Sequence, residues 1–147
     1  MFFSQANICF PVFEEASFKN IYSDHKENIS PALLSNLYAN ALIYWEGSPE
    51  LRANRCPNIR FIWVQANEAL NSELFLSPGL STVMAIILNV GSRPSTAIFG
   101  NGVMIGAAVA LSNALGLNRD PSTWNISPSE KSFRVRHWWL VVMHDRW

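Results

Sequence analysis

Charge of either sign is scarce in this sequence. Only 15% of its 147 residues are charged, and 11 lysines and arginines balance 11 aspartates and glutamates. A chain with a formal net charge of zero has no overall field that would draw it to DNA phosphates or to an acidic lipid surface. We therefore expect neither direct DNA binding nor association with a membrane.

Cysteines and long apolar runs are also scarce. Cys9 and Cys56 are the two cysteines, and they lie too far apart in sequence to form a zinc motif, so two reduced thiols are favoured. The longest apolar run, residues 103–111, falls far short of the roughly 18 residues that a membrane-spanning helix needs. The first residues lack the basic segment and apolar stretch of a signal peptide.

Apolar and aromatic residues are abundant by contrast. Hydrophobic residues make up 49% of the chain, which has six tryptophans and nine phenylalanines. With so few charges, the surface is expected to expose apolar side chains, which is typical of a protein that contacts a partner or a further stretch of chain.

Helix signals dominate the sequence. Apolar residues recur at steps of three and four between Ser-Pro and other proline breaks, and no alternating run with a hairpin turn occurs. The pattern predicts helices over residues 13–25, 31–45, 57–75, 81–90 and 102–115, and from 128 to the end of the chain. The expected fold is all-α, an irregular helical bundle of about six or seven helices.

Several helix ends have specific signatures. Ser30 before Pro31 fits an N-cap, and Ser127 with Glu130 three residues later fits a capping box. Gly116 fits a left-handed helix cap, with Leu117 placed to pack back on the helix. Residues 83–88 are apolar on every side, so their helix is predicted to lie in the centre of the bundle.

A glycine-rich stretch invites comparison with a dinucleotide fingerprint. Gly100, Gly102 and Gly106 precede Asp120 at a suggestive distance. The fingerprint needs a strand before the glycines and another before the acid, and neither is predicted. A helix entry with small residues for close packing is the better interpretation.

His137 and His144 resemble a metal pair only superficially. Seven residues along a helix separate them by roughly 10 Å, whereas two ligands of one zinc must each come within about 2 Å of it. His144 and Asp145 are neighbours that point about 100° apart, and no serine or cysteine is marked as a nucleophile. We therefore expect structural histidines and no catalytic, metal-binding or cofactor-binding residue.

The last fourteen residues, RVRHWWLVVMHDRW, continue a helical pattern up to Trp147. Glu130 and Arg134 are spaced for an ion pair on one helix face. Trp138 and Trp139 are expected to anchor the core, and Asp145 is expected to pair with Arg119 or Arg93. The pattern predicts the interior of a larger helical body that is truncated in its last helix.

Four stretches, residues 8–18, 29–51, 61–95 and 106–147, resemble the fungal-specific transcription factor domain. This is the middle regulatory region of fungal binuclear zinc-cluster factors, also called the xylanolytic-activator type regulatory domain. The resemblance covers essentially the whole chain, and its most specific part is the tail. The residues of that motif are Gly116, Leu117, Arg119, Trp124, Glu130, Arg134, Arg136, Trp138, Trp139, Asp145 and Arg146.

The resemblance implies that residues 1–147 are the N-terminal part of a non-catalytic, nuclear regulatory domain. Such a domain controls RNA polymerase II transcription of metabolic genes through protein partners or the rest of the same factor. Zinc and DNA binding are expected only in a separate N-terminal six-cysteine segment that is absent here. A metabolite-binding helical module is the alternative function, and the chain is a fragment, a short gene model or a degenerate copy.

Overall fold

The computed structural model describes residues 2–4, 6–9, 11–92 and 98–146, and it confirms the all-α prediction. These residues form helices and turns without a strand. The elements in chain order are α1 (Ala6–Cys9), α2 (Glu15–Asp24), η1 (Lys26–Asn28), α3 (Pro31–Leu42), α4 (Ile59–Leu76), α5 (Leu80–Ser92), α6 (Ile98–Ala114) and α7 (Pro128–Arg146).

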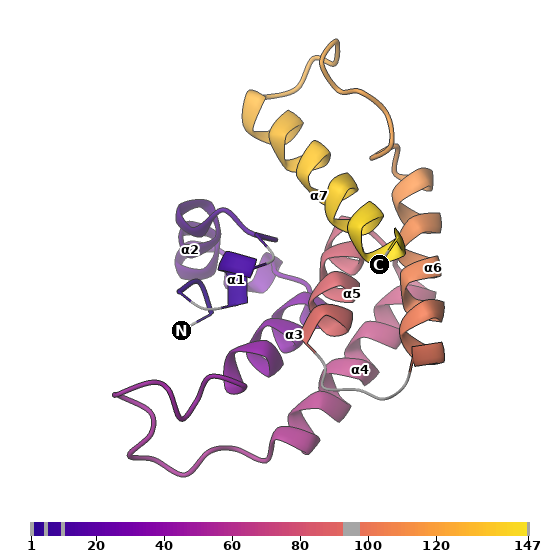
Figure 1. The fold of residues 1–147 in the computed structure, drawn as a ribbon. Helices are drawn as coiled ribbons and strands as arrows, with labels where there is room; N and C mark the ends of the chain where they lie inside the picture. The colour runs from indigo at the N-terminus through magenta and orange to yellow at the C-terminus, as the bar shows by residue number, and fades with distance from the viewer. Residues whose placement is uncertain (1, 5, 10, 93–97, 147) are drawn as a thin grey trace.

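Helix α5 is the centre of the bundle. It packs against α3 and α4 on one side and against α6 and α7 on the other, as Figure 1 shows. Residues 82–89 of α5 are all buried, which confirms the prediction from its all-round apolar sequence. A helix covered on every face is held by its neighbours rather than by its own propensity.

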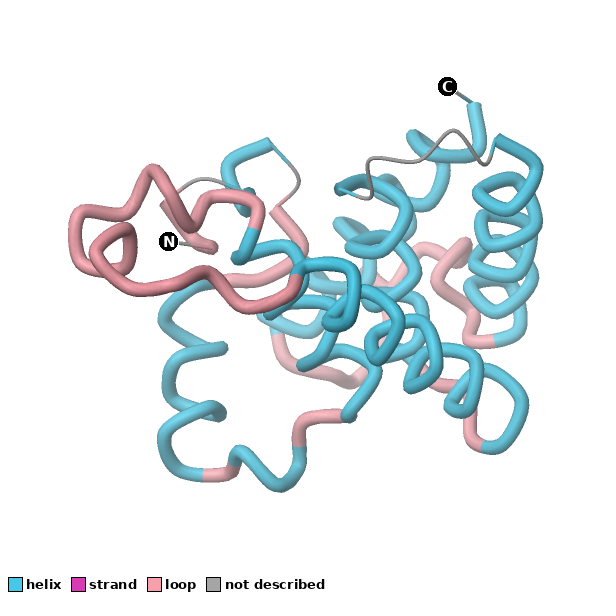
Figure 2. The backbone as a smooth tube through the Cα atoms, turned by 90° about the horizontal axis from the view of Figure 1, so that it is seen from below, coloured by secondary structure: helices cyan, strands magenta, loops and turns pink. Residues whose placement is uncertain are grey.

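The segment between α3 and α4 is a long excursion from the bundle. Residues 43–58 loop away from the helices, and Figure 2 shows this stretch among the loops on one side of the molecule. The Trp45 indole N–H donates to the Asn54 carbonyl at 3.2 Å, which ties the two arms of the loop together.

The helix ends largely follow the predicted signatures. The Ser30 and Ser127 hydroxyls accept hydrogen bonds from the Leu33 and Glu130 amides, each at 3.1 Å. Gly116 has φ 68°, and the Leu117 amide donates back to the Ser112 carbonyl at 2.9 Å. This left-handed cap leaves Leu117 almost completely buried, as predicted.

Several helix starts differ from the prediction by one to four residues, including those of α6 and α4. Helix α6 begins at Ile98 instead of residue 102, so Gly100 and Gly102 lie inside it. The roughly 1 kcal/mol cost of a helical glycine is offset because Ile105 and Ala108 further along α6 are buried in the main core. Helix α4 begins at Ile59, where the Asn58 side chain caps the Phe61 amide at 3.0 Å.

Buried asparagines join α3, α4 and α5. Asn36 and Asn40 of α3 and Asn89 of α5 are fully buried. The Asn89 side-chain amide donates to the side-chain oxygen of Asn36 at 2.8 Å and to that of Asn67 in α4 at 3.0 Å. Asn67 therefore turns toward the neighbouring helices although its side chain is polar.

The other two amides of this asparagine network reach backbone carbonyls. Asn36 Nδ2 donates to Ala66 of α4 at 3.3 Å, and Asn40 Nδ2 donates to Leu88 of α5 at 3.1 Å. Each also donates to a carbonyl four residues earlier in α3. All three buried NH₂ groups therefore use both of their hydrogens, so the network sets the relative register of three helices.

His137 anchors α7 against the N-terminal segment. Its imidazole is fully buried, stacks near Phe133 with ring centroids 3.9 Å apart, and its Nδ1 contacts the Phe133 carbonyl at 2.7 Å. Nε2 makes no hydrogen bond of ordinary geometry within the described residues. The Val12 backbone acts to raise the pKa of His137, but this effect is smaller than that of burial. Burial lowers the pKa of His137 to about 4. His137 is thus held inside the core by its own helix and by the N-terminal segment.

We predict that Asn36→Leu lowers the free energy of unfolding by about 2 kcal/mol or more, because it leaves a buried N–H of Asn89 without its acceptor. Urea denaturation measures this change. Asn113→Leu is the matched control, since Asn113 is exposed and makes only a bond to the Val109 carbonyl of its own helix. Equal unfolding midpoints for the two variants would contradict a structural role for the network.

We predict that the protein loses stability as the pH falls from about 6.5 to 4. In that window the unfolded chain protonates His137 while the folded chain does not. The gap between the ordinary pKa of 6.5 and about 4 corresponds to about 3 kcal/mol at the acid end. Urea denaturation at several pH values tests this. His137→Asn should flatten the profile in this window, and His25→Asn, at an exposed site, should leave it unchanged.

Candidate binding pocket

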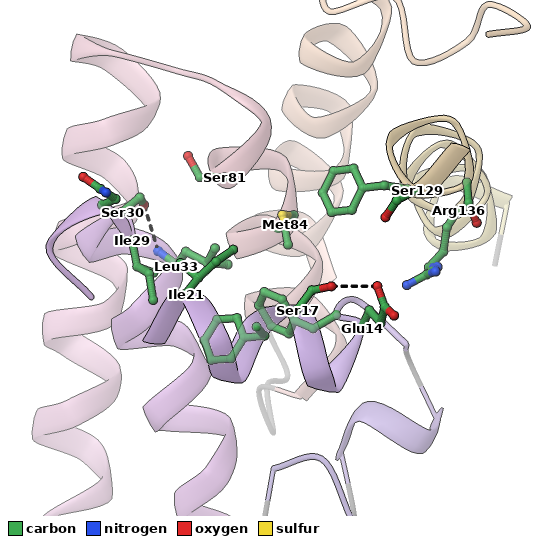
Figure 3. A pocket seen from close by; sticks show the side chains of 15 residues that line it. Glu14, Ser17, Ile21, Ile29, Ser30, Leu33, Ser81, Met84, Ser129 and Arg136 are labelled. Atoms are coloured by element: carbon green, nitrogen blue, oxygen red, sulfur yellow. Dashed lines mark hydrogen bonds between the residues drawn. The ribbon is translucent and has the colours of Figure 1, made fainter. Parts of the chain in front are cut away.

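A pocket of about 590 Å³ opens between α2, the start of α3, the start of α5 and the first half of α7. Figure 3 shows side chains from all four helices converging on it. Its deep walls are apolar, with Phe13, Leu33 and Met84 nearly buried. Polar side chains lie among its lining, most of them serines. A concave apolar space with a few polar groups is the usual form of a small-molecule site.

The aromatic wall is positioned by the N-terminal segment. Phe13 and Phe18 pack with ring centroids 4.5 Å apart, and Phe2 lies against Phe13 at 5.8 Å. The Asn7 side chain accepts from the Phe13 amide and donates to the Phe13 carbonyl, both at 3.1 Å. This reciprocal pair fixes the backbone of Phe13 and so positions the residue at the wall of the pocket.

Helix α2 forms the outer wall and has no buried residue of its own. The Tyr22 hydroxyl meets the Tyr38 hydroxyl of α3 at 2.7 Å, and the Lys26 ammonium lies 4.9 Å from the Tyr22 ring centroid. The hydrogen bond with Tyr38 lowers the pKa of Tyr22, while burial raises the pKa of Tyr38. These surface contacts and Phe18 attach α2 to the bundle.

Glu73 fixes the opposite wall. Its carboxylate on α4 accepts hydrogen bonds from Ser30 at the start of α3 and from Ser81 and Thr82 at the start of α5. Ser81 lies 2.9 Å and Thr82 2.7 Å from Oε1. A carboxylate beside two helix N-termini is favoured by both helix dipoles. Glu73 thereby holds together the two helix starts that line the pocket.

One predicted motif residue, Arg136, lines this pocket. Figure 3 shows its side chain extending from α7 toward Glu14 on the other side of the pocket. Glu14 precedes α2, and its carboxylate accepts the Ser17 hydroxyl at 2.8 Å. The pocket therefore carries one positive and one negative side chain on facing walls.

Five other motif residues meet where α6 ends and α7 begins. Arg134 contacts Glu130 at 3.2 Å, as predicted, and its guanidinium lies 5.2 Å from the Trp124 ring centroid. Arg134 also donates to the Leu115 carbonyl at 3.4 Å, beside Gly116 and the buried Leu117. In the loop between the helices, hydrogen bonds from Ser122 lower the pKa of Asp120.

The core anchors and the ion pair predicted for the end of α7 are not observed among the described residues. Trp139 is 61% exposed, so the prediction that it anchors the core is wrong, and Trp138 is only half-buried. Asp145 pairs with its exposed neighbour Arg146 at 3.4 Å instead of Arg119, whose side chain is exposed. Arg93 lies outside the described residues. The hydrophobic side of α7 turns His137, Leu140 and Val141 inward, which leaves Trp139 outward.

The remaining sequence candidates are the histidines, the cysteines and the glycine-rich stretch. Within the described residues no set of three His, Cys, Asp or Glu side chains converges as a metal site, and no helix is long and apolar enough to cross a membrane. His144 Nδ1 contacts the Leu140 carbonyl at 2.8 Å, the same bond to its own helix that His137 makes. Cys56 is a free thiol. Gly100 and Gly102 are helical, not part of a phosphate-binding turn.

Sequence reasoning identified Arg136 but missed the other pocket residues. Glu14, Met84 and Phe133 come from distant segments and share no spacing or motif. A weak indication existed in the two acidic residues 14 and 15 directly after the aromatic Phe13. Nothing in the sequence placed them opposite α7.

Comparison with known proteins places this fold in a family. An uncharacterized transcriptional regulatory protein of Schizosaccharomyces pombe is 32% identical over 149 residues, covering 100% of this chain and 22% of the relative. Transcriptional activator protein DAL81 of Saccharomyces cerevisiae is 27% identical over 150 residues, covering 100% of this chain and 15% of the relative. The chain therefore spans about a fifth or less of these relatives. No solved structure matches it.

The family described as "Fungal specific transcription factor domain" matches residues 1–147, which is the whole chain. This agrees with the resemblance found in the sequence and with the all-α fold. The chain belongs to the fungal-specific transcription factor domain family.

Proposed function

We propose that residues 1–147 act as a non-catalytic regulatory and interaction domain of a fungal transcription factor. The match of the whole chain to the family is the observation that carries this proposal. The two relatives whose names describe transcriptional regulation support it. In this role the domain works in the nucleus and controls RNA polymerase II transcription of metabolic genes by restraining or releasing activation.

An exposed apolar stripe on α7 supports contacts with proteins. Val135, Trp139 and Met143 are spaced by four residues, so they lie on one face of the helix, and they are 42%, 61% and 42% exposed. We call these three residues the α7 stripe. Exposed aromatic and methionine side chains in one patch are typical of interface cores. The partner in this proposal is another protein or another part of the same factor.

A second candidate function is binding of a metabolite. The pocket of about 590 Å³ between α2, α3, α5 and α7 favours it, because this volume lies within the usual range for small-molecule sites. The two functions are compatible, since a regulatory domain can respond to a ligand.

We predict that this domain changes transcription when placed between a heterologous DNA-binding domain and an activation domain in a fungal reporter strain. The output should fall several-fold relative to the fusion that lacks residues 1–147, and Trp139→Gln should reverse much of the fall by removing an interface anchor. Phe61→Gln is the matched control, because Phe61 is 59% exposed but lies on α4. Equal reporter output with and without the domain, at equal protein levels, would refute a regulatory role.

We also predict that residues 1–147 alone bind neither zinc nor duplex DNA. In this proposal both activities belong to a separate segment of such factors, and the zero net charge supplies no driving force for phosphate binding. Metal analysis of purified protein and gel retardation at about 0.15 M salt measure these activities. Stoichiometric zinc, or retardation that depends on DNA sequence, would show that the domain carries them itself.

A further inference from the structure

Two opposite charges face each other across the pocket without neutralising each other. Arg136 extends from α7, and Glu14 faces it from the residue before α2, as Figure 3 shows. Among the described residues, the Glu14 carboxylate accepts a hydrogen bond only from the neutral Ser17 hydroxyl, at 2.8 Å. No hydrogen bond or ion pair engages the Arg136 guanidinium within the described part of the chain. The two groups lie beyond the 4.0 Å limit of an ion pair, so both charges stay available to a ligand in the pocket.

Beside these charges lies an apolar space. Met84 and Leu33 close its base and are 6% and 7% exposed, while Phe18 and Phe133 are half-buried at its sides. Aromatic rings on two helices suit a flat or branched apolar group. The small hydroxyls of Ser129 and Ser132, at the start of α7, add hydrogen-bonding capacity beside Arg136.

We propose that this pocket binds a small amphipathic zwitterion, such as a free amino acid with a large apolar side chain. Its carboxylate lies on Arg136, its ammonium group on Glu14, and its apolar body among Phe18, Met84 and Phe133. This inference deepens the second candidate function, metabolite binding, and rests on it. It adds the chemical class of the ligand and the two residues that select it.

The pairing of charges decides the ligand class. A simple anion gains Arg136 but approaches the Glu14 carboxylate, and a simple amine gains Glu14 but approaches Arg136. Only a molecule with both charges on one end satisfies both groups. Arginine also offers two parallel N–H donors to a carboxylate, which fixes the orientation of the ligand.

Isothermal titration calorimetry with four probes tests this proposal on the full 147-residue chain. L-Phenylalanine carries both charges and an apolar body, 3-phenylpropionate lacks the ammonium group, 2-phenylethylamine lacks the carboxylate, and glycine lacks the apolar body. We expect L-phenylalanine to bind at least about tenfold more tightly than each of the other three.

Variants locate the site. Arg136→Gln should weaken L-phenylalanine binding about tenfold or more, and Glu14→Gln should weaken it several-fold while improving 3-phenylpropionate. Arg146→Gln is the matched control, because the Arg146 side chain is 78% exposed at the far end of α7, and it should bind like the parent. Thermal melting of each variant checks that the fold is retained.

The possible failures are distinct. If 3-phenylpropionate or 2-phenylethylamine binds as tightly as L-phenylalanine, and only one of the variants Arg136→Gln and Glu14→Gln weakens binding, the pocket binds ligands but the zwitterion proposal is wrong. At a probe concentration of about 10 mM, binding with a dissociation constant of about 1 mM would still be detected. If none of the probes then produces heat or a shift in melting temperature, this inference is overturned. The regulatory role tested by the reporter fusion stands or falls separately.

Discussion

The buried asparagines between α3, α4 and α5 are the constraint on which the rest of the structure depends. A centre made only of aliphatic side chains packs in several registers at similar free energy, whereas amide groups need partners at fixed positions. Asn89 reaches α3 and α4 at once through Asn36 and Asn67. One residue at the end of the buried stretch of α5 therefore aligns three helices, and a register slip would strand polar groups in the core.

The pocket is a consequence of that alignment at the opposite end of the same helices. Once the register of α3 and α5 is set, their first turns come within reach of Glu73, which bonds to both. The α3–α5 wall is therefore rigid. The α2 wall has no buried residue in its helix and relies on Phe18 and the Tyr22–Tyr38 contact. Local stability differs between the walls because apolar burial differs, so α2 is the side on which opening is least costly.

Sequence periodicity predicted the helices because apolar residues recur at helical spacing, and Ser30, Ser127 and Gly116 mark some of the helix ends directly. The all-apolar stretch 83–88 likewise indicated the central helix. The asparagine network and the pocket were beyond this reasoning, because asparagine looks polar and solvent-facing until its partners on other helices are known. The prediction for Trp139 was wrong for a related reason. Apolar residues occur on nearly every side of α7, so composition alone did not indicate which face turns inward.

Helix α7 connects the proposals physically. One side of it is fixed in the core by His137, Leu140 and Val141, while Arg136 reaches the pocket and the α7 stripe faces outward. If the backbone of α7 shifts as a rigid element when Arg136 binds a ligand, Trp139 moves with it. In that case the two proposed binding events would be coupled, and linkage would require each to alter the affinity of the other by the same factor. The fully buried, neutral His137 lies within the helix that would have to move, which limits that motion to small shifts in packing.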